Sequence, residues 1–101
     1  MKLTKSPAKC NGIEEIRNQI DQIDQEIICL FAQRSEFVHE IVKYKTDEVS
    51  VIAIERKELV ISQRGEWAVA AGLNKQTFQD IYARLLQQNI SEELFLLQLN
   101  K

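Results

Sequence analysis

The stretch that decides the fold is IRNQIDQIDQEIICLFAQR, residues 16–34. Its apolar residues recur every three or four positions, which is the spacing of one face of an α-helix. Two rows with a seven-residue spacing extend this pattern in both directions: Ile13, Ile20, Ile27, Arg34 and Ile41 in one row, and Ile16, Ile23, Leu30 and Phe37 in the other. We therefore predict one helix from about Ile13 to Lys45, roughly 50 Å long at about 1.5 Å per residue.

The remainder of the chain predicts two more helices. Residues 46–54, TDEVSVIAI, are rich in β-branched side chains and are predicted to form a loop. A second apolar pattern starts at about Ile54 and stops at Gly72, a residue suited to a left-handed helix end. Asn74 can cap a third helix, whose apolar stripe includes the polar residues Asn89 and Glu93. The predicted fold class is all-α, a three-helix chain with one long N-terminal helix.

Length, composition and charge narrow the class of protein. The 101 residues, 45% hydrophobic and 28% charged, indicate one small globular domain that would gain stability from oligomerisation. A formal net charge of −2 offers no basic surface for nucleic acid, so no nucleic-acid partner is expected. No apolar run is long enough to cross a membrane and no export signal is visible, so we expect a cytoplasmic protein without a membrane partner. We expect residues 1–12 to be a leader and residues 13–101 to form one helical domain.

The residues that usually hold metals or act as nucleophiles are few. Cys10 and Cys29 are too few and too far apart for a zinc site. His39 is the one histidine and has no obvious nucleophile arranged with it, so we interpret it as a solvated helix residue. The sequence therefore predicts neither a metal site nor a cofactor.

Arg34 occupies a position that the seven-residue repeat reserves for burial. Lys45, eleven residues later on the predicted helix, would differ from it by about 20° in direction and about 16 Å in height, so both side chains can approach one small anion. A buried guanidinium needs a partner, which would be a bound carboxylate or a carboxylate of the protein, unless the side chain extends to water. Glu93, on one helix face with Asn89, is a candidate partner and, if burial keeps it protonated, a hydrogen-bond donor.

Arg17 lies on a neighbouring row of the first helix, about 25 Å from the level of Arg34. That distance is too long for both residues of one chain to hold the same small ligand. Two such helices packed antiparallel across a twofold axis would bring Arg17 of one chain near Arg34 and Lys45 of the other. We therefore expect a homodimer with two equivalent sites, each shared between the chains.

Several stretches together resemble a known family. Residues 16–34 with FVHEIVKYK (37–45), AIER (53–56), RGEWAVAAGL (64–73) and NISEEL (89–94) are similar to the all-helical chorismate mutases, and most closely to their isochorismate pyruvate lyase branch. The resemblance covers about residues 10–97. It implies an intertwined helical homodimer that binds a small dicarboxylate, isochorismate or chorismate, and that uses no metal or organic cofactor.

The resemblance also implies a role for individual residues. Arg17 from the partner chain and Arg34 would hold substrate carboxylates, and Lys45 would contact the ether oxygen of the enolpyruvyl group. Arg56 matches an arginine that follows a mobile loop and would bind substrate. Glu93 stands where the family places a glutamine or a glutamate that hydrogen-bonds the ether oxygen. Asn89, one turn earlier, is a further substrate-binding candidate.

Two positions depart from the typical mutase pattern. Ala53 and Lys57 stand where typical mutases carry acidic residues, and the lyase branch also lacks these acids. We therefore expect isochorismate pyruvate lyase activity, which converts isochorismate to salicylate and pyruvate. Chorismate mutase activity, which converts chorismate to prephenate, is the alternative. A third reading is a catalytically degenerate dimer that serves as a regulatory or binding partner.

Overall fold

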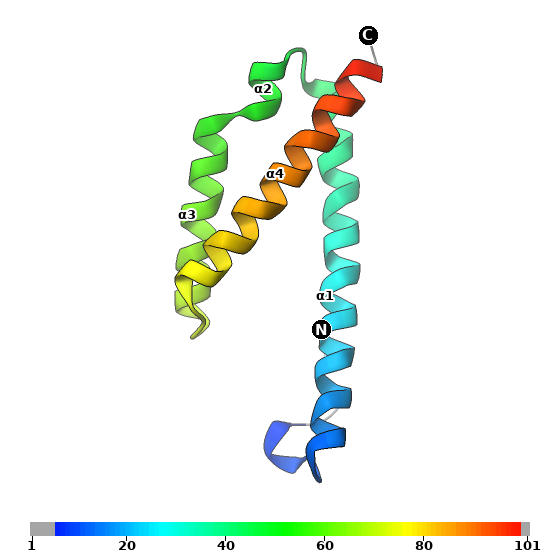
Figure 1. Ribbon diagram of the computed structural model, residues 1–101, viewed down its shortest axis with the longest axis vertical. Helices are drawn as coiled ribbons and strands as arrows, with labels where there is room; N and C mark the ends of the chain where they lie inside the picture. Colours follow the sequence, from blue (N-terminus) through cyan, green and yellow to red (C-terminus); the bar gives the residue numbers. More distant parts are fainter. Residues whose placement is uncertain (1–5, 100–101) are drawn as a thin grey trace. The chain divides into compact units, whose positions relative to one another are not determined.

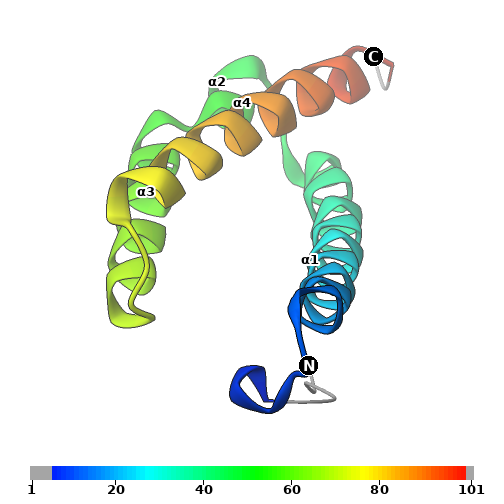
Figure 2. The same cartoon turned by 60° about the horizontal axis from the view of Figure 1, so that its bottom comes forward.

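The computed structural model describes residues 6–99 as a helical chain (Figures 1 and 2). Residues 1–5 of the predicted leader and residues 100–101 of the predicted helical domain lie outside the described part. The elements in chain order are η1 (Pro7–Lys9), α1 (Ile13–Ile41), η2 (Val42–Tyr44), α2 (Glu48–Ile52), α3 (Ile54–Ala70) and α4 (Lys75–Leu99), where η denotes a 3₁₀ turn. Residues 6–99 contain no strand, so the predicted all-α class is confirmed.

The chain divides between Glu36 and Phe37 into two compact units. The first unit contains η1 and most of α1, which begins at Ile13 as predicted. Two acidic residues, Glu14 and Glu15, lie in its first turn, where negative charge is favourable. No α1 side chain is buried in the described chain, and Phe37, on the second row of the repeat, is 77% exposed. The apolar stripe of α1 is therefore open to solvent.

The long helix ends four residues earlier than predicted. α1 stops at Ile41, and Lys45 follows η2 with an extended backbone. Val42 is 3% exposed and packs with Val51 and Leu97, so tertiary packing fixes this segment in a conformation that a continuous helix would not allow. The prediction that Lys45 shares a helix face with Arg34 is therefore wrong.

The predicted loop at residues 46–54 contains a short helix, α2, so that part of the prediction is also wrong. Asp47 accepts a hydrogen bond from the backbone N–H of Ser50, and the Ser50 hydroxyl lies 3.5 Å from the Asp47 N–H, which completes a capping box. Ala53, with φ of 41°, ends α2 in the left-handed region and lets α3 begin in a new direction.

Helices α3 and α4 form a hairpin within the second unit (Figure 1). The turn after α3 contains Gly72 at φ +78°, and the N–H of Leu73 returns to the carbonyl of Ala68 at 2.8 Å, as in a Schellman motif. The side-chain oxygen of Asn74 accepts the Thr77 N–H at 2.9 Å and caps α4. Both predicted helix boundaries are confirmed.

The core of the second unit lies where α4 meets η2 and α2. Its buried members are Val42, Val51 and Leu97, and the partly buried Ile90, Leu94 and Leu96 pack against them. Along the hairpin, Val60 and Ala68 of α3 are also buried. No helix in residues 6–99 has both the length and the apolar character needed to cross a lipid bilayer.

Gly65 of α3 lies against the side chain of Gln79 on α4. A Cβ atom at this position would lie 2.7 to 3.0 Å from side-chain atoms of Gln79, which is too close. We predict that Gly65→Ala destabilises the protein by about 1 kcal/mol, because displacing Gln79 costs more than the helix propensity of alanine returns. In a Gln79→Ala background the same change should stabilise by about 1 kcal/mol. Urea denaturation of the four proteins tests this change of sign, and equal effects in both backgrounds would contradict it.

Candidate active site

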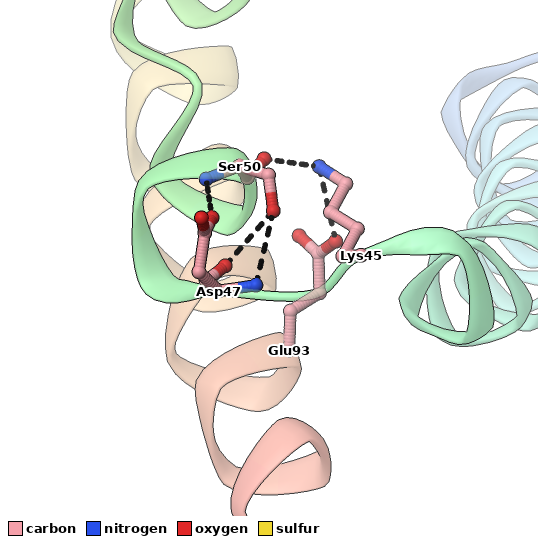
Figure 3. A network of polar contacts seen from close by, with 4 residues as sticks. All are labelled: Lys45, Asp47, Ser50 and Glu93. Carbon is pink, nitrogen blue, oxygen red and sulfur yellow. Dashed lines mark hydrogen bonds and ion pairs between the residues drawn. The ribbon is translucent and has the colours of Figure 1, made fainter.

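The candidate site is centred on an ion pair between Lys45 and Glu93. Lys45 Nζ lies 3.8 Å from Glu93 Oε1, and the two side chains are 19% and 8% exposed (Figure 3). Glu93 belongs to α4, whereas Lys45 follows η2, so the pair joins segments far apart in the sequence. The structure thus brings together the two residues that were predicted to be catalytic.

A second contact fixes the lysine side chain. Lys45 Nζ donates a hydrogen bond of 2.8 Å to the backbone carbonyl of Ser50 in α2, and Figure 3 shows the ammonium between this oxygen and the Glu93 carboxyl group. The backbone of Lys45 is held as well, because its N–H donates to the Val42 carbonyl at 3.0 Å. The ammonium therefore points toward α2 and α4 rather than into bulk solvent.

The capping box of α2 holds the Ser50 carbonyl in position. The Asp47 carboxylate accepts the Ser50 N–H at 2.8 Å, and the Ser50 hydroxyl donates to the Asp47 carbonyl at 2.9 Å. The backbone N–H of Ser50, and then its hydroxyl, hold the pKa of Asp47 below the ordinary 3.8. The cap is therefore complete above pH 3.8 and is lost as the pH falls through the folded-state pKa.

Asn89 lies one helical turn before Glu93. Both side chains are buried, at 5% and 6% residue exposure, on the inner face of α4. The interrupted apolar stripe predicted this placement correctly. An amide and a carboxyl group four residues apart can present donors and acceptors along one face.

Within residues 6–99, no hydrogen bond or ion pair connects Arg56 to Lys45 or Glu93. It is exposed in the first turn of α3. It lines a surface cavity of about 540 Å³ together with mostly apolar neighbours, namely Val49, Ile52, Ala53, Ile54 and Glu55. The cavity joins an apolar wall to one guanidinium and one carboxylate.

Arg17 and Arg34 belong to the first unit. Arg17 is exposed and forms an ion pair of 3.3 Å with Glu14, one turn earlier on α1. Arg34 is half-buried on the row of the seven-residue repeat. Their place in a binding site stays a prediction.

Sequence reasoning missed the contacts of three residues near the candidate site, Asp47, Ser50 and His39. Asp47 and Ser50 form the cap that positions Lys45, and their spacing in the sequence is that of a capping box. His39 was interpreted as a solvated helix residue and is exposed on α1, but the 2.6 Å contact of its Nε2 with Glu92 Oε2 was not predicted. No local pattern indicates that contact, because the two residues are 53 positions apart.

The arrangement can stabilise negative charge. A largely desolvated ammonium with fixed direction favours an anion or an oxygen that gains charge in a transition state. The neighbouring carboxyl group can donate a hydrogen bond to the same oxygen when it is protonated. Within residues 6–99, no group of three or more His, Cys, Asp or Glu side chains is placed to hold a metal ion.

Comparisons with known proteins find similar sequences over most of the chain. The family model described as chorismate mutase type II matches residues 16–94, a range that contains all six predicted site residues. The chain is 29% identical over 90 residues to isochorismate pyruvate lyase of Pseudomonas aeruginosa, and the match covers 89% of each chain. It is also 29% identical over 83 residues to the T-protein of Haemophilus influenzae, a match that covers 81% of this chain and 22% of that protein.

Proposed function

Because the chain belongs to the chorismate mutase type II family, we propose that it is a pericyclic enzyme that converts isochorismate to salicylate and pyruvate. The observation that carries this proposal is the desolvated Lys45–Glu93 pair in a chain that matches an isochorismate pyruvate lyase over 89% of both lengths. The reaction breaks one ether bond and moves one hydrogen from the ring to the enolpyruvyl methylene carbon. No other reactant enters, so we propose no cofactor and no metal.

Lys45 and Glu93 would act on the ether oxygen, where negative charge grows as the carbon–oxygen bond lengthens. The ammonium of Lys45 contacts the Ser50 carbonyl and Glu93 in the ligand-free chain. The ether oxygen of a bound substrate would replace these contacts. Once the substrate takes up the ammonium, a protonated Glu93 becomes the better partner, because it donates a second hydrogen bond to the ether oxygen.

The substrate is a dicarboxylate, and we propose that three arginines and Asn89 bind it. Arg34 and Arg56 would each hold a carboxylate, while Arg17 would come from the partner chain. Asn89 would direct its amide toward the ligand from the face that it shares with Glu93. Fixing both carboxylates holds the enolpyruvyl arm over the ring, which lowers the entropic part of the barrier.

We propose that the functional form is a homodimer. The exposed apolar rows of α1 recur every seven residues, a pattern typical of helices that pack against other helices. A second copy presents the same stripe, so a twofold axis pairs identical surfaces and generates two equivalent sites. Arg17 and Arg34 are too far apart on one α1 to hold the same small ligand, but they can meet when they come from different chains. We place this dimer in the cytoplasm.

The residues before and after Arg56 favour the lyase over the mutase reaction. Ala53 and Lys57 replace the acidic residues that typical mutases use near the chorismate ring hydroxyl. Chorismate mutase remains the second candidate, since the resemblance includes that activity. The same replacements support a third candidate, a degenerate dimer that binds a partner without turnover.

Incubating the purified protein separately with isochorismate and chorismate tests the proposal. We expect fluorescent salicylate from isochorismate and little prephenate from chorismate. Lys45→Ala should lower kcat by about 100-fold or more, because it removes the charge at the ether oxygen. Lys43→Ala is the matched control: Lys43 is exposed, pairs with Glu40 and should be dispensable. Absence of turnover on both substrates between about pH 5 and 8 would contradict an enzymatic function.

The pH dependence of turnover tests the role of Glu93. If its carboxyl group must be protonated, the rate should rise as the pH falls toward about 5. Glu93→Gln keeps a hydrogen-bond donor that does not titrate, so its profile should be flat over this range. Stopped-flow or steady-state rates of the two proteins at matched substrate saturation measure this. An identical profile in the variant would remove Glu93 as the donor.

A further inference from the structure

A contact between His39 and Glu92 joins the last turn of α1 to α4. His39 Nε2 lies 2.6 Å from Glu92 Oε2, with side chains 46% and 34% exposed. Both residues belong to the second unit, the unit that also contains Lys45 and Glu93. The contact therefore joins two residues that are far apart in the sequence, within the same unit as the proposed catalytic pair.

Both oxygens of Glu92 have a partner. Gln88, one turn earlier on α4, donates to Oε1 at 3.0 Å, and His39 lies against Oε2. The Gln88 amide, and then the His39 ring, hold the pKa of the Glu92 carboxyl group below its ordinary value of 4.5. Glu92 is thus ionised at neutral pH, and it loses its charge as the pH falls through that lowered pKa.

The two ends of this contact adjoin the two ends of the catalytic pair. Glu92 immediately precedes Glu93, and consecutive residues of a helix point about 100° apart. Glu92 therefore turns toward His39 while Glu93 turns toward Lys45. His39 lies on the segment that leads through η2 to Lys45, so a shift of α4 along this segment would break both contacts together.

Resting on the proposed function, we propose that His39 and Glu92 are a positioning pair, which holds α4 against the end of α1 so that Lys45 and Glu93 meet at the ether oxygen. Neither residue touches the reacting atoms in this account. Nearby Ser91 does not extend the pair into a nucleophilic triad, because its hydroxyl donates to the Gln87 carbonyl at 3.1 Å. A partly exposed polar contact contributes little to stability by itself, so the pair should affect turnover more than unfolding.

Steady-state kinetics on isochorismate test the positioning role. His39→Ala and Glu92→Ala should each lower kcat about tenfold with KM within about twofold, because misplacement affects the transition state more than binding. The double variant should be no slower than either single variant. His39→Gln keeps an N–H near the position of Nε2 and should recover most of kcat. Melting temperatures should match the parent protein.

The ion pair between Glu66 and Lys75 provides the control, since it also joins two helices, at 2.9 Å, near the α3–α4 turn. Lys75→Ala should leave kcat within about twofold. The proposal is overturned if His39→Ala has no larger effect than Lys75→Ala, or if the effects of the two pair members add.

A ligand-free measurement separates this inference from the proposed function. The Lys45 N–H, bonded to Val42, should exchange with solvent faster in His39→Ala and Glu92→Ala than in the parent or Lys75→Ala. If the parent protein turns over neither substrate, the proposed function fails. Faster exchange at Lys45 in the two variants would still support the positioning role of His39 and Glu92. Unchanged exchange at Lys45 would overturn the positioning role regardless of activity.

Discussion

The ion pair between Lys45 and Glu93 is the constraint on which the candidate site depends. Two charged groups that are largely removed from water are tolerated only when each has a partner. The chain meets this requirement for Lys45 with the Ser50 carbonyl and the carboxyl group of Glu93. A dianionic ligand that enters must replace these contacts. The groups that stabilise the ligand-free chain are therefore the ones that the proposed reaction uses.

The features that the sequence predicted are those set by local patterns. Helical spacing gave the start of α1, and the turn residues Gly72 and Asn74 gave the boundaries of the α3–α4 hairpin. Asn89 and Glu93 were found because polar residues on an apolar stripe are costly to bury without a use. The family resemblance assigned Lys45 and Glu93 to the same ether oxygen, and in the structure Lys45 Nζ lies 3.8 Å from Glu93 Oε1.

The features that sequence reasoning missed depend on contacts between distant segments. α1 ends at Ile41 because Val42 is buried against α2 and α4, which the helical period of α1 does not reveal. The short α2 was overlooked because its β-branched residues suggested a loop, although the Asp47–Ser50 spacing carried a capping signal. In the proposed homodimer Arg17 reaches a site only through a second chain, so a single sequence predicts its role only through symmetry and resemblance.

The most direct test of the account is subunit complementation, because the proposed site takes Arg17 from one chain and Lys45 from the other. Arg17→Ala and Lys45→Ala would each be inactive alone, and the two would be mixed, unfolded and refolded together. Half of the random dimers would then carry one intact site, so the account predicts about one quarter of the parent activity. No recovery in a mixture shown to contain the mixed dimer, or a protein that sediments as a monomer while active, would contradict it.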